Sequence, residues 1–324
     1  GVLGDQFQVN TTTGNDQTTA ALNRGSQQAV AYDAAGNFVV VWTSTNQDGD
    51  GDGVYARRFD STGVALTGEI RVNSTTSDDQ NGARVASEAD GKFIVTWTSM
   101  NQDGNAEGVY WRRFDASGIA QTAETRANTT TAGPQRNSVI ALNEAAGQFV
   151  LAWEGQGSGA NYDIFYRRYQ LSTGASLDAT RPAANATDAG AEADPTAAMD
   201  STGRFVIAWE DADNRVYAQR FSGGTGDMNG TLIQVGVAGA NSTGAAIAMD
   251  GSGNFTLVYR GVSIVSGIWA KGFNADDGSN LYSGLHTVLG WLAVDIAGGN
   301  DAASPSIAMA PDGTFVVTYQ KTGV

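Results

Sequence analysis

Short apolar runs separated by glycine-containing turns recur along the whole chain. In six segments a phenylalanine follows such a turn and opens a short run, rich in β-branched residues, that ends in tryptophan or tyrosine. The six phenylalanines are Phe38, Phe93, Phe149, Phe205, Phe255 and Phe315, and the six closing aromatics are Trp42, Trp97, Trp153, Trp209, Tyr259 and Tyr319. Successive phenylalanines are 55, 56, 56, 50 and 60 residues apart. A period of this size predicts a repeat architecture in which each repeat is one supersecondary unit.

The runs themselves predict buried strands. They are about five residues long and bounded by turns, which favours strands over helices. Apolar residues stand at consecutive positions, as in Phe-Val-Val-Val-Trp at 38–42, instead of alternating with polar ones. Both faces of these strands must then be covered. No stretch keeps a 3.6-residue period, so the sequence predicts almost no helix.

Four strands can be assigned to each repeat. A run of small residues comes first, the Phe-to-Trp run second, and the fourth strand is exemplified by residues 69–73 and 7–10. The third strands are predicted at 54–59, 109–114, 164–169, 216–221 and 268–273. Four strands in about 55 residues match one propeller blade. The predicted fold is therefore all-β, with residues 1–324 forming a single six-bladed β-propeller domain.

The chain neither begins nor ends at the boundary of a four-strand repeat. The chain begins with a predicted fourth strand, whereas the last repeat has no third strand in this sequence. The last blade is therefore expected to be incomplete or closed by the N-terminal strand. Either the native chain extends beyond Val324, or another molecule, such as a second copy, adds the missing strand.

Composition narrows the class of protein. The net charge of −15 argues against nucleic acid, because nucleic-acid binding depends on basic side chains that neutralise phosphates. Zero cysteines exclude disulfides and thiolate metal sites. No run of 18 apolar residues is present, so membrane insertion is not expected. An acidic chain without cysteine and rich in Gly, Asn, Asp and Thr predicts a bacterial protein that is extracellular or on the cell surface.

One loop has the pattern of a calcium ligand set. Asp48, Asp50 and Asp52 alternate before Gly53, so three carboxylates could converge on one hard cation. The second repeat has a weaker copy made of Asp103, Asn105 and Glu107. Phe59 stands where an EF-hand has its bidentate acid, so this is not a helix-flanked site. The alternative is a solvated acidic hairpin loop without metal.

Two polar patterns recur from repeat to repeat. Arginines stand in the third strand at Arg57-Arg58, Arg112-Arg113, Arg167-Arg168 and, singly, Arg220. We expect one arginine of each doublet to bridge neighbouring blades; the alternative is a basic ligand-binding rim. Asn-x-Ser/Thr sequons follow the fourth strand at Asn10, Asn73 and Asn128, where they either form turns between blades or accept glycans.

The chain has few groups suited to catalysis. Its one histidine, His286, has no motif around it. Glu210, Asp211 and Asp213 could form a carboxylate cluster, but sequence cannot give their separation. No catalytic residue was assigned, and the sequence predicts that the protein is not an enzyme. Aromatics outside the repeated positions could stack on sugar rings; these are Trp111, Tyr162, Trp269, Tyr282 and Trp291.

Several runs resemble repeats of large bacterial secreted and surface proteins that are joined to RTX-type or cadherin-like modules. They are Gly-Asn-Phe-Val-Val-Val-Trp-Thr-Ser, Gln-Asp-Gly, Gly-Val-Tyr-Ala-Arg-Arg-Phe-Asp and Ile-Arg-Val-Asn in the first repeat. The strand order is also similar to NHL-type propellers. The resemblance implies an extracellular adhesive or scaffolding role, with copies of the chain, other surface proteins or glycans as partners. It transfers no catalytic residue.

The leading functional hypothesis from sequence is thus a non-enzymatic structural or adhesive module that assembles through its incomplete blade. The alternatives are a carbohydrate-binding propeller and a polysaccharide-active enzyme.

Overall fold

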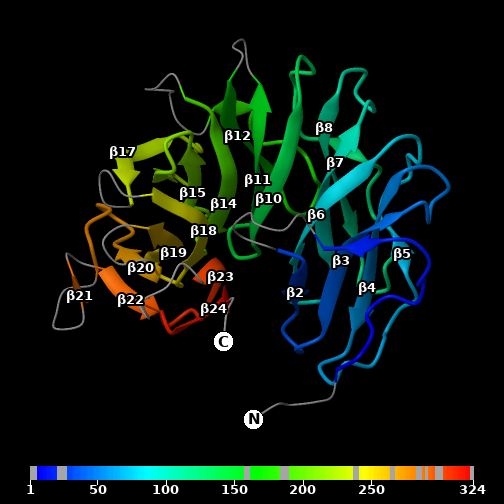
Figure 1. Cartoon of the computed structure of the whole chain (residues 1–324), viewed down its shortest axis with the longest axis horizontal. Helices are drawn as coiled ribbons and strands as arrows, with labels where there is room; N and C mark the ends of the chain where they lie inside the picture. The colour runs from blue at the N-terminus through cyan, green and yellow to red at the C-terminus, as the bar shows by residue number, and fades with distance from the viewer. Residues whose placement is uncertain are drawn as a thin grey trace. The chain divides into compact units, whose positions relative to one another are not determined.

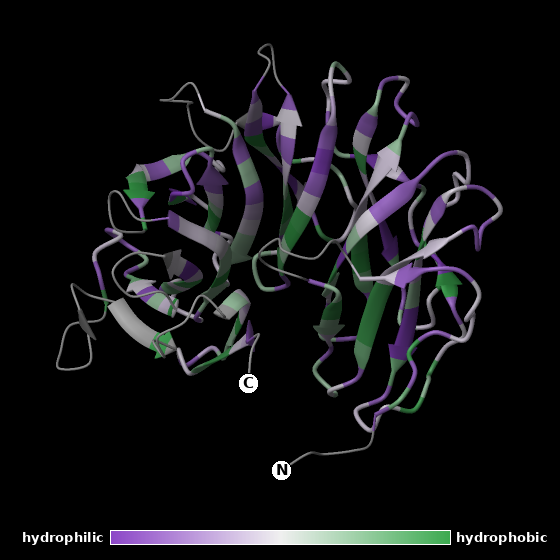
Figure 2. Cartoon of the chain, viewed as in Figure 1, coloured by the Kyte–Doolittle hydropathy of each residue, from purple (hydrophilic) through white to green (hydrophobic). Residues whose placement is uncertain are grey.

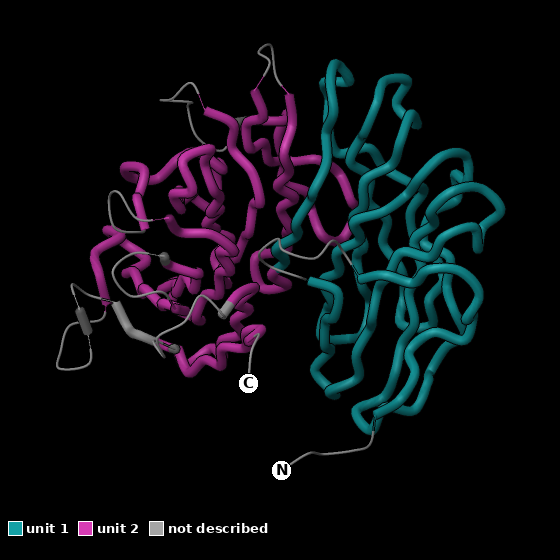
Figure 3. Tube along the Cα trace, in the orientation of Figure 1, with its two compact units in different colours: residues 1–21, 28–142 teal, residues 22–27, 143–324 magenta. Residues whose placement is uncertain are grey.

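The structure, a computed structural model, describes most of the chain. The described residues are 6–19, 28–156, 161–182, 190–235, 241–262, 267–281, 287–288, 291–295 and 302–321. They divide into two compact units (Figure 3). The first comprises residues 1–21 and 28–142, and the second comprises residues 22–27 and 143–324. The single-domain assignment stays a prediction.

The first unit contains two small antiparallel sheets, drawn in blue to teal in Figure 1. In the first sheet the strand order is β1-β3-β4-β5, and β2 also pairs with β3; in the second the order is β6-β7-β8-β9. The strands are β1 (Gln17–Thr18), β2 (Val30–Tyr32), β3 (Phe38–Thr45), β4 (Asp52–Phe59), β5 (Ile70–Arg71), β6 (Gln80–Ser87), β7 (Phe93–Met100), β8 (Glu107–Phe114) and β9 (Thr125–Arg126). Strand β10 (Gln135–Asn143) runs to the boundary of this unit.

The second unit repeats the same organisation. Its strand orders are β11-β12-β13, β14-β15-β16-β17, β18-β19-β20-β22-β21 and β23-β24. The strands are β11 (Gln148–Gln156), β12 (Tyr162–Gln170), β13 (Arg181–Pro182), β14 (Glu192–Met199), β15 (Phe205–Asp211), β16 (Val216–Phe221), β17 (Met228–Gln234), β18 (Asn241–Met249), β19 (Phe255–Val262), β20 (Gly267–Phe273), β21 (Thr287–Val288), β22 (Trp291–Asp295), β23 (Ala302–Met309) and β24 (Phe315–Lys321).

The all-β prediction is confirmed. Every regular element of the described residues is a strand, and the predicted third strands correspond to β4, β8, β12, β16 and β20. The fourth strand predicted at 69–73 is shorter in the structure, because β5 has two residues, and the strand predicted at 7–10 is wrong, since those residues form no strand. No helix in the described part of the chain is long and apolar enough to cross a membrane.

The Asp-x-x-Gly turns before the second strands are built as their residue types require. Asp33 Oδ1 accepts hydrogen bonds from the backbone N–H groups of Ala35 and Asn37, at 3.0 and 2.9 Å. Gly36 has a φ of +80°, a conformation that glycine adopts without a steric penalty. An aspartate that caps its own turn and a left-handed glycine therefore fix each hairpin.

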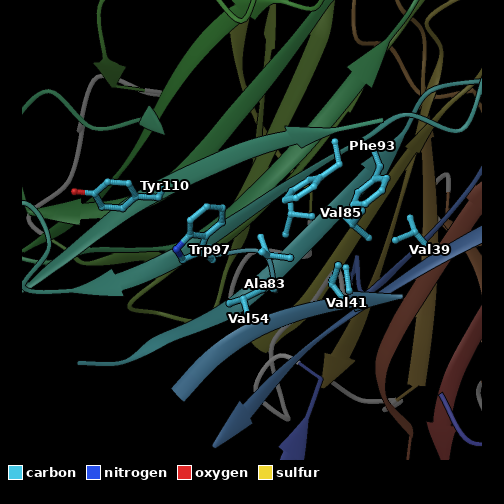
Figure 4. Packing of buried hydrophobic residues seen from close by; sticks show 12 residues of the cluster. Val39, Val41, Val54, Ala83, Val85, Phe93, Trp97 and Tyr110 are labelled. Carbon is cyan, nitrogen blue, oxygen red and sulfur yellow. The ribbon is translucent and has the colours of Figure 1, made fainter. Parts of the chain in front are cut away.

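Neighbouring sheets pack face to face through the recurrent aromatic positions. In the first unit, Val39 and Val41 of β3 lie against Val85 of β6 and against Phe93 and Trp97 of β7 (Figure 4). Phe93 and Trp97 are both 0% exposed. Hydrophobic residues lie mainly on the strands, whereas the hairpin loops are largely hydrophilic (Figure 2). Burial on both faces explains why the apolar residues are consecutive in sequence.

The last repeat differs from this prediction. Tyr319, the counterpart of Trp97, is 37% exposed, and Val316 is 60% exposed. The sheet β23-β24 has only two strands in the described part of the chain, so β24 lacks the neighbouring strand that β3 and β7 have. The aromatic position of the last repeat is therefore not a core position as it is in the others.

Candidate active site

A bulge interrupts the first strand of most repeats. The ladder between first and second strands shifts register on β6, β14, β18 and β23. At each bulge one residue is left-handed: Gly82, Asp194, Gly244 and Ser304, with φ of 67°, 53°, 67° and 49°. Left-handed backbone is costly for residues other than glycine, so it persists only where its surroundings hold it. Bulges also recur next to active sites, where they re-aim side chains and expose backbone groups.

Two buried glutamates of the second unit hold these bulges. Glu154 on β11, 1% exposed, accepts a 2.9 Å hydrogen bond from the backbone N–H of Asp194. Glu210 on β15, 8% exposed, accepts hydrogen bonds from the backbone N–H groups of Gly244 and Ala245. Each carboxylate thus links its own sheet to the next one in sequence. A buried carboxylate that accepts backbone N–H groups stays satisfied away from water.

A third glutamate binds the preceding sheet in sequence instead of the following one. Glu192, the first residue of β14, is 9% exposed, and its Oε2 accepts a 3.1 Å hydrogen bond from the backbone N–H of Ile164 on β12. Glu154 pairs with the same Ile164 across the β11-β12 ladder. Glu192 thus binds the amide of the residue that pairs with Glu154 across this ladder.

Asp163 lies beside that amide. It precedes Ile164 on β12, so the amide that Glu192 binds belongs to the peptide bond that joins Asp163 to Ile164. Its side chain is half-buried, and within the described ranges it has no hydrogen-bond or ion-pair partner. Burial raises the pKa of the Asp163 carboxyl above its ordinary value of 3.8, because removal from water disfavours the charged form. A carboxyl group whose pKa is raised by burial is a candidate for acid–base chemistry.

This arrangement can perform proton transfer. A carboxylic acid that stays protonated can donate its proton to a leaving oxygen, while a second carboxylate activates water or attacks directly. Asp163 and Glu192 bring two carboxyl groups to one end of β12, because Glu192 binds the backbone amide that follows Asp163. We therefore take this end of β12 as the candidate site.

The carboxylate cluster expected at 210–213 is divided among structural roles. Glu210 holds the bulge of β18. Asp211 closes the β15-β16 hairpin, because its Oδ1 accepts from the backbone N–H groups of Asp213 and Arg215. Asp213 has an ion pair with Arg215 at 2.8 Å, and its side chain is 74% exposed. Asp211 and Asp213 therefore share Arg215, whereas Glu210 binds the bulge of β18, so the three carboxylates do not form one cluster.

The three aspartates of the expected calcium loop also have separate partners. Asp48 Oδ2 accepts from Asn73 Nδ2 at 2.7 Å, and Asp52 Oδ1 accepts from Thr45 Oγ1 at 2.7 Å. Asp50 Oδ2 accepts from the backbone N–H of Asp78 at 3.2 Å. The described residues contain no group of three His, Cys, Asp or Glu side chains placed to hold a metal ion. Calcium in this loop stays a prediction.

The side chains in the weaker copy of the loop also have separate partners. Asp103 Oδ2 accepts from Asn128 Nδ2 at 3.0 Å, and its Oδ1 accepts from the backbone N–H of Asn105 at 3.2 Å. Glu107 lies 3.6 Å from the guanidinium of Arg136. These contacts join turns to strands within the first unit.

Two of the sequon asparagines are structural. Asn73 and Asn128 are 1% and 2% exposed. Asn73 Oδ1 accepts from the backbone N–H of Val54, and Asn128 Oδ1 accepts from that of Val109, at 2.8 and 3.0 Å. Their amide nitrogens are donors to aspartate, so they are not available to a glycan in the folded protein. The turn interpretation of these two sequons is confirmed.

The arginine doublets bridge repeats as expected. In the first repeat Arg58 forms an ion pair with Asp33 at 2.8 Å and also donates to the carbonyl of Ala116, which belongs to the next repeat. Arg57 donates to the carbonyl of Val9 at 2.8 Å. Both members of the doublet are therefore structural cross-links.

The candidate sugar-stacking aromatics do not form a common surface. Trp111 is 1% exposed and belongs to the core, so its assignment was wrong. Tyr162 and Trp269 are half-buried on β12 and β20. Tyr282, His286 and the Trp291 side chain lie outside the described residues.

Asp163 and Glu192 were missed, although the repeat contains a signal for both. Asp163 stands where other repeats have Gly53, Gly108 and Gly267. Glu192 opens its strand where β6 and β10 begin with Gln80 and Gln135. Glu192 binds the amide of Ile164, whose counterparts in the first two repeats are bound by asparagines. The repeat explains that hydrogen bond, but it does not explain why carboxyl groups stand at 163 and 192, which makes both residues candidates for function.

Comparison with known proteins supports the fold but no family. No family model and no curated protein sequence matches the chain. A solved structure of a Dyadobacter fermentans protein of unknown function is 12% identical, with 96% of this chain and 97% of that chain covered at a TM-score of 0.58. A Penicillium chrysogenum alpha-L-arabinanase complexed with arabinobiose is 10% identical, with 94% and 98% covered at a TM-score of 0.56. An ulvan lyase of polysaccharide lyase family PL25 is 10% identical, with 95% and 82% covered at a TM-score of 0.56.

At these identities the similarity shows the fold, which is of the propeller class. The number of blades stays a prediction. The similarity to RTX-type adhesins and NHL propellers is not shown.

The comparisons overturn the prediction of a non-enzymatic structural or adhesive module. The similar structures of known activity are glycan-active enzymes, an arabinanase and a polysaccharide lyase. The prediction rested on the lack of histidine and cysteine motifs. That lack does not exclude glycan chemistry, because two carboxyl groups on separate strands are enough for it.

Proposed function

We propose that the protein is an extracellular glycan-active enzyme that cleaves a neutral polysaccharide at the end of β12. The carboxyl group of Asp163 donates its proton to the leaving oxygen as the glycosidic bond breaks, and the carboxylate of Glu192 takes a proton from the water that attacks the anomeric carbon. The observation that carries this proposal is the half-buried Asp163, whose pKa is raised by burial and which adjoins the backbone amide that the buried Glu192 binds.

Charge favours a neutral substrate. The chain carries a net charge of −15, and the proposed site itself consists of carboxyl groups. An anionic polymer would be repelled by the protein and by the site. The arabinanase among the similar structures supports a neutral glycan, and the ulvan lyase is the reason to include an acidic one in the assay. A polymeric glycan also agrees with action outside the cell.

The proposal is tested by measuring the release of reducing ends from arabinan, other neutral polysaccharides and an acidic polysaccharide. Wild-type protein should cleave at least one neutral polymer. Glu192→Gln restores the residue found at this position in two other repeats, so it should fold normally. It should lower the rate by about 10²–10⁴-fold, the usual contribution of one acid–base group.

Asp213→Asn is the matched control, because Asp213 is an exposed carboxylate of the same unit whose ion pair is with Arg215. Its activity should equal that of the wild type. Full activity of Glu192→Gln would refute the role of this carboxylate, and binding without cleavage of any polymer would refute the enzyme assignment.

A further inference from the structure

The second arginine of the third strand occupies the same buried position in successive repeats. In the second unit, Nη1 of Arg168 donates to the carbonyl of Gly223, and Nη1 of Arg220 donates to the carbonyl of Ala275 at 3.0 Å. Each carbonyl belongs to the repeat that follows. Arg168 and Arg220 are 2% and 6% exposed. The two guanidinium groups are thus equivalent in position and in backbone contact.

A carboxylate neutralises this arginine in the first three repeats. The pairs are Arg58–Asp33, Arg113–Glu88 and Arg168–Asp178, with N–O distances of 2.8, 2.7 and 2.6 Å. Arg220 has no ion pair among the residues that the structure describes, and its Nε is buried without a hydrogen bond. The nearest acidic influence is the exposed Asp277, whose pKa is lowered by hydrogen bonds from Ser279 and, to a smaller extent, by the charge of Arg220. A buried charge without a partner is strongly unfavourable, so this position calls for a counter-charge.

The missing carboxylate is present but engaged elsewhere. Asp200 is the fourth-repeat counterpart of Asp33, and its Oδ2 is bound by Nε of Arg204 at 2.7 Å. The first repeat has Asn37 at the position of Arg204, and Asn37 leaves the aspartate able to pair with the third-strand arginine. The substitution of arginine for asparagine in the turn therefore withdraws the counter-ion from Arg220.

A small cavity adjoins the unpaired guanidinium. Its volume is about 10 Å³, which is room for one particle of about the size of a water molecule. The lining includes two arginines, an asparagine and apolar groups: Arg204, Arg220, Asn229, Phe205, Phe255 and Ala275. The lining contains no acidic side chain. Arg204 is 31% exposed and forms ion pairs with Asp200 and Asp276, at 2.7 and 3.0 Å.

We propose that this cavity binds a monatomic anion, chloride under physiological salt, between Arg220 and Arg204. The anion replaces the carboxylate that the first three repeats supply. It neutralises the buried guanidinium and accepts the hydrogen bond of Arg220 Nε. The site stabilises the fourth sheet and is separate from the carboxyl groups of the proposed active site.

Bromide provides a direct probe of the site. Crystals of the full chain grown in sodium bromide should show an anomalous peak within hydrogen-bonding distance of Arg220 Nε. In solution, the thermal midpoint of the wild type should be higher in sodium chloride than in sodium gluconate of equal concentration, because an anion that binds only the folded state stabilises it.

The variant Arg204→Asn tests whether the pairing of Asp200 with Arg204 is what creates the anion site. This change restores the residue of the first repeat and releases Asp200 to pair with Arg220. The variant should keep the fold and lose the difference between chloride and gluconate. Arg215→Asn is the control, since Arg215 also pairs with an aspartate four residues earlier, Asp211, and lies outside the cavity lining. It should keep the chloride response. A water molecule at Nε without a bromide peak, or a chloride response that survives in Arg204→Asn, would overturn the proposal.

Discussion

At the scale of single residues, the site consists of departures from a repeat. Asp163 replaces a glycine, and Glu192 replaces a glutamine. Asp163 is held in a half-buried position without a described partner, which costs stability when the carboxyl is ionised. A residue that is unfavourable for folding and adjoins the amide that Glu192 binds agrees with a function in chemistry.

The raised pKa of Asp163 predicts a pH dependence of stability. A group that binds protons more tightly in the folded state makes folding less favourable as pH rises from its unfolded pKa, near 3.8, through its raised folded value. Asp163→Asn should therefore be more stable than the wild type near neutral pH, and the two should converge below pH 3.8. Denaturant unfolding at several pH values measures this difference. Equal stability of the two proteins at all pH values would show that the carboxyl is not desolvated.

At the scale of elements, the second strands supply the core and the first strands supply the bulges. The consecutive apolar residues of the second strands made their burial predictable from sequence. The bulges were not predictable, because they depend on hydrogen bonds from another repeat, such as the one that Glu154 accepts from Asp194. The repeat pattern of one sequence indicates which positions are buried. It does not indicate which backbone group a glutamate will bind.

Because the second strands form the core, we expect Trp97→Ala to lower the stability of the folded protein strongly. Trp97 is fully buried between β7 and the strands of the neighbouring sheet. Its removal leaves a cavity and should lower the free energy of unfolding by about 3–5 kcal/mol. Tyr319→Ala, at the equivalent but partly exposed position, should cost much less. Chemical denaturation of both variants compares them, and similar losses would contradict the difference in burial.

At the scale of the whole molecule, the repeat dictates the fold and its exceptions indicate the function. The sequence pattern was sufficient to predict the propeller class, because the aromatic positions, the glycine turns and the third strands recur in phase. The candidate site lay beyond that reasoning, since the averaged repeat has glycine and glutamine where the site has Asp163 and Glu192. Scarcity of histidine and absence of cysteine do not argue against glycan chemistry, because that chemistry needs only carboxyl groups.

The most direct measurement is the activity of Asp163→Gly on the neutral polysaccharide that the wild type cleaves best. Glycine is the residue of three other repeats at this position, so the variant should fold as the wild type does, and far-ultraviolet circular dichroism verifies this. We predict that the release of reducing ends falls by about 10²-fold or more, as expected for loss of a general acid. A folded Asp163→Gly variant with wild-type activity would contradict the assignment of the site to the end of β12.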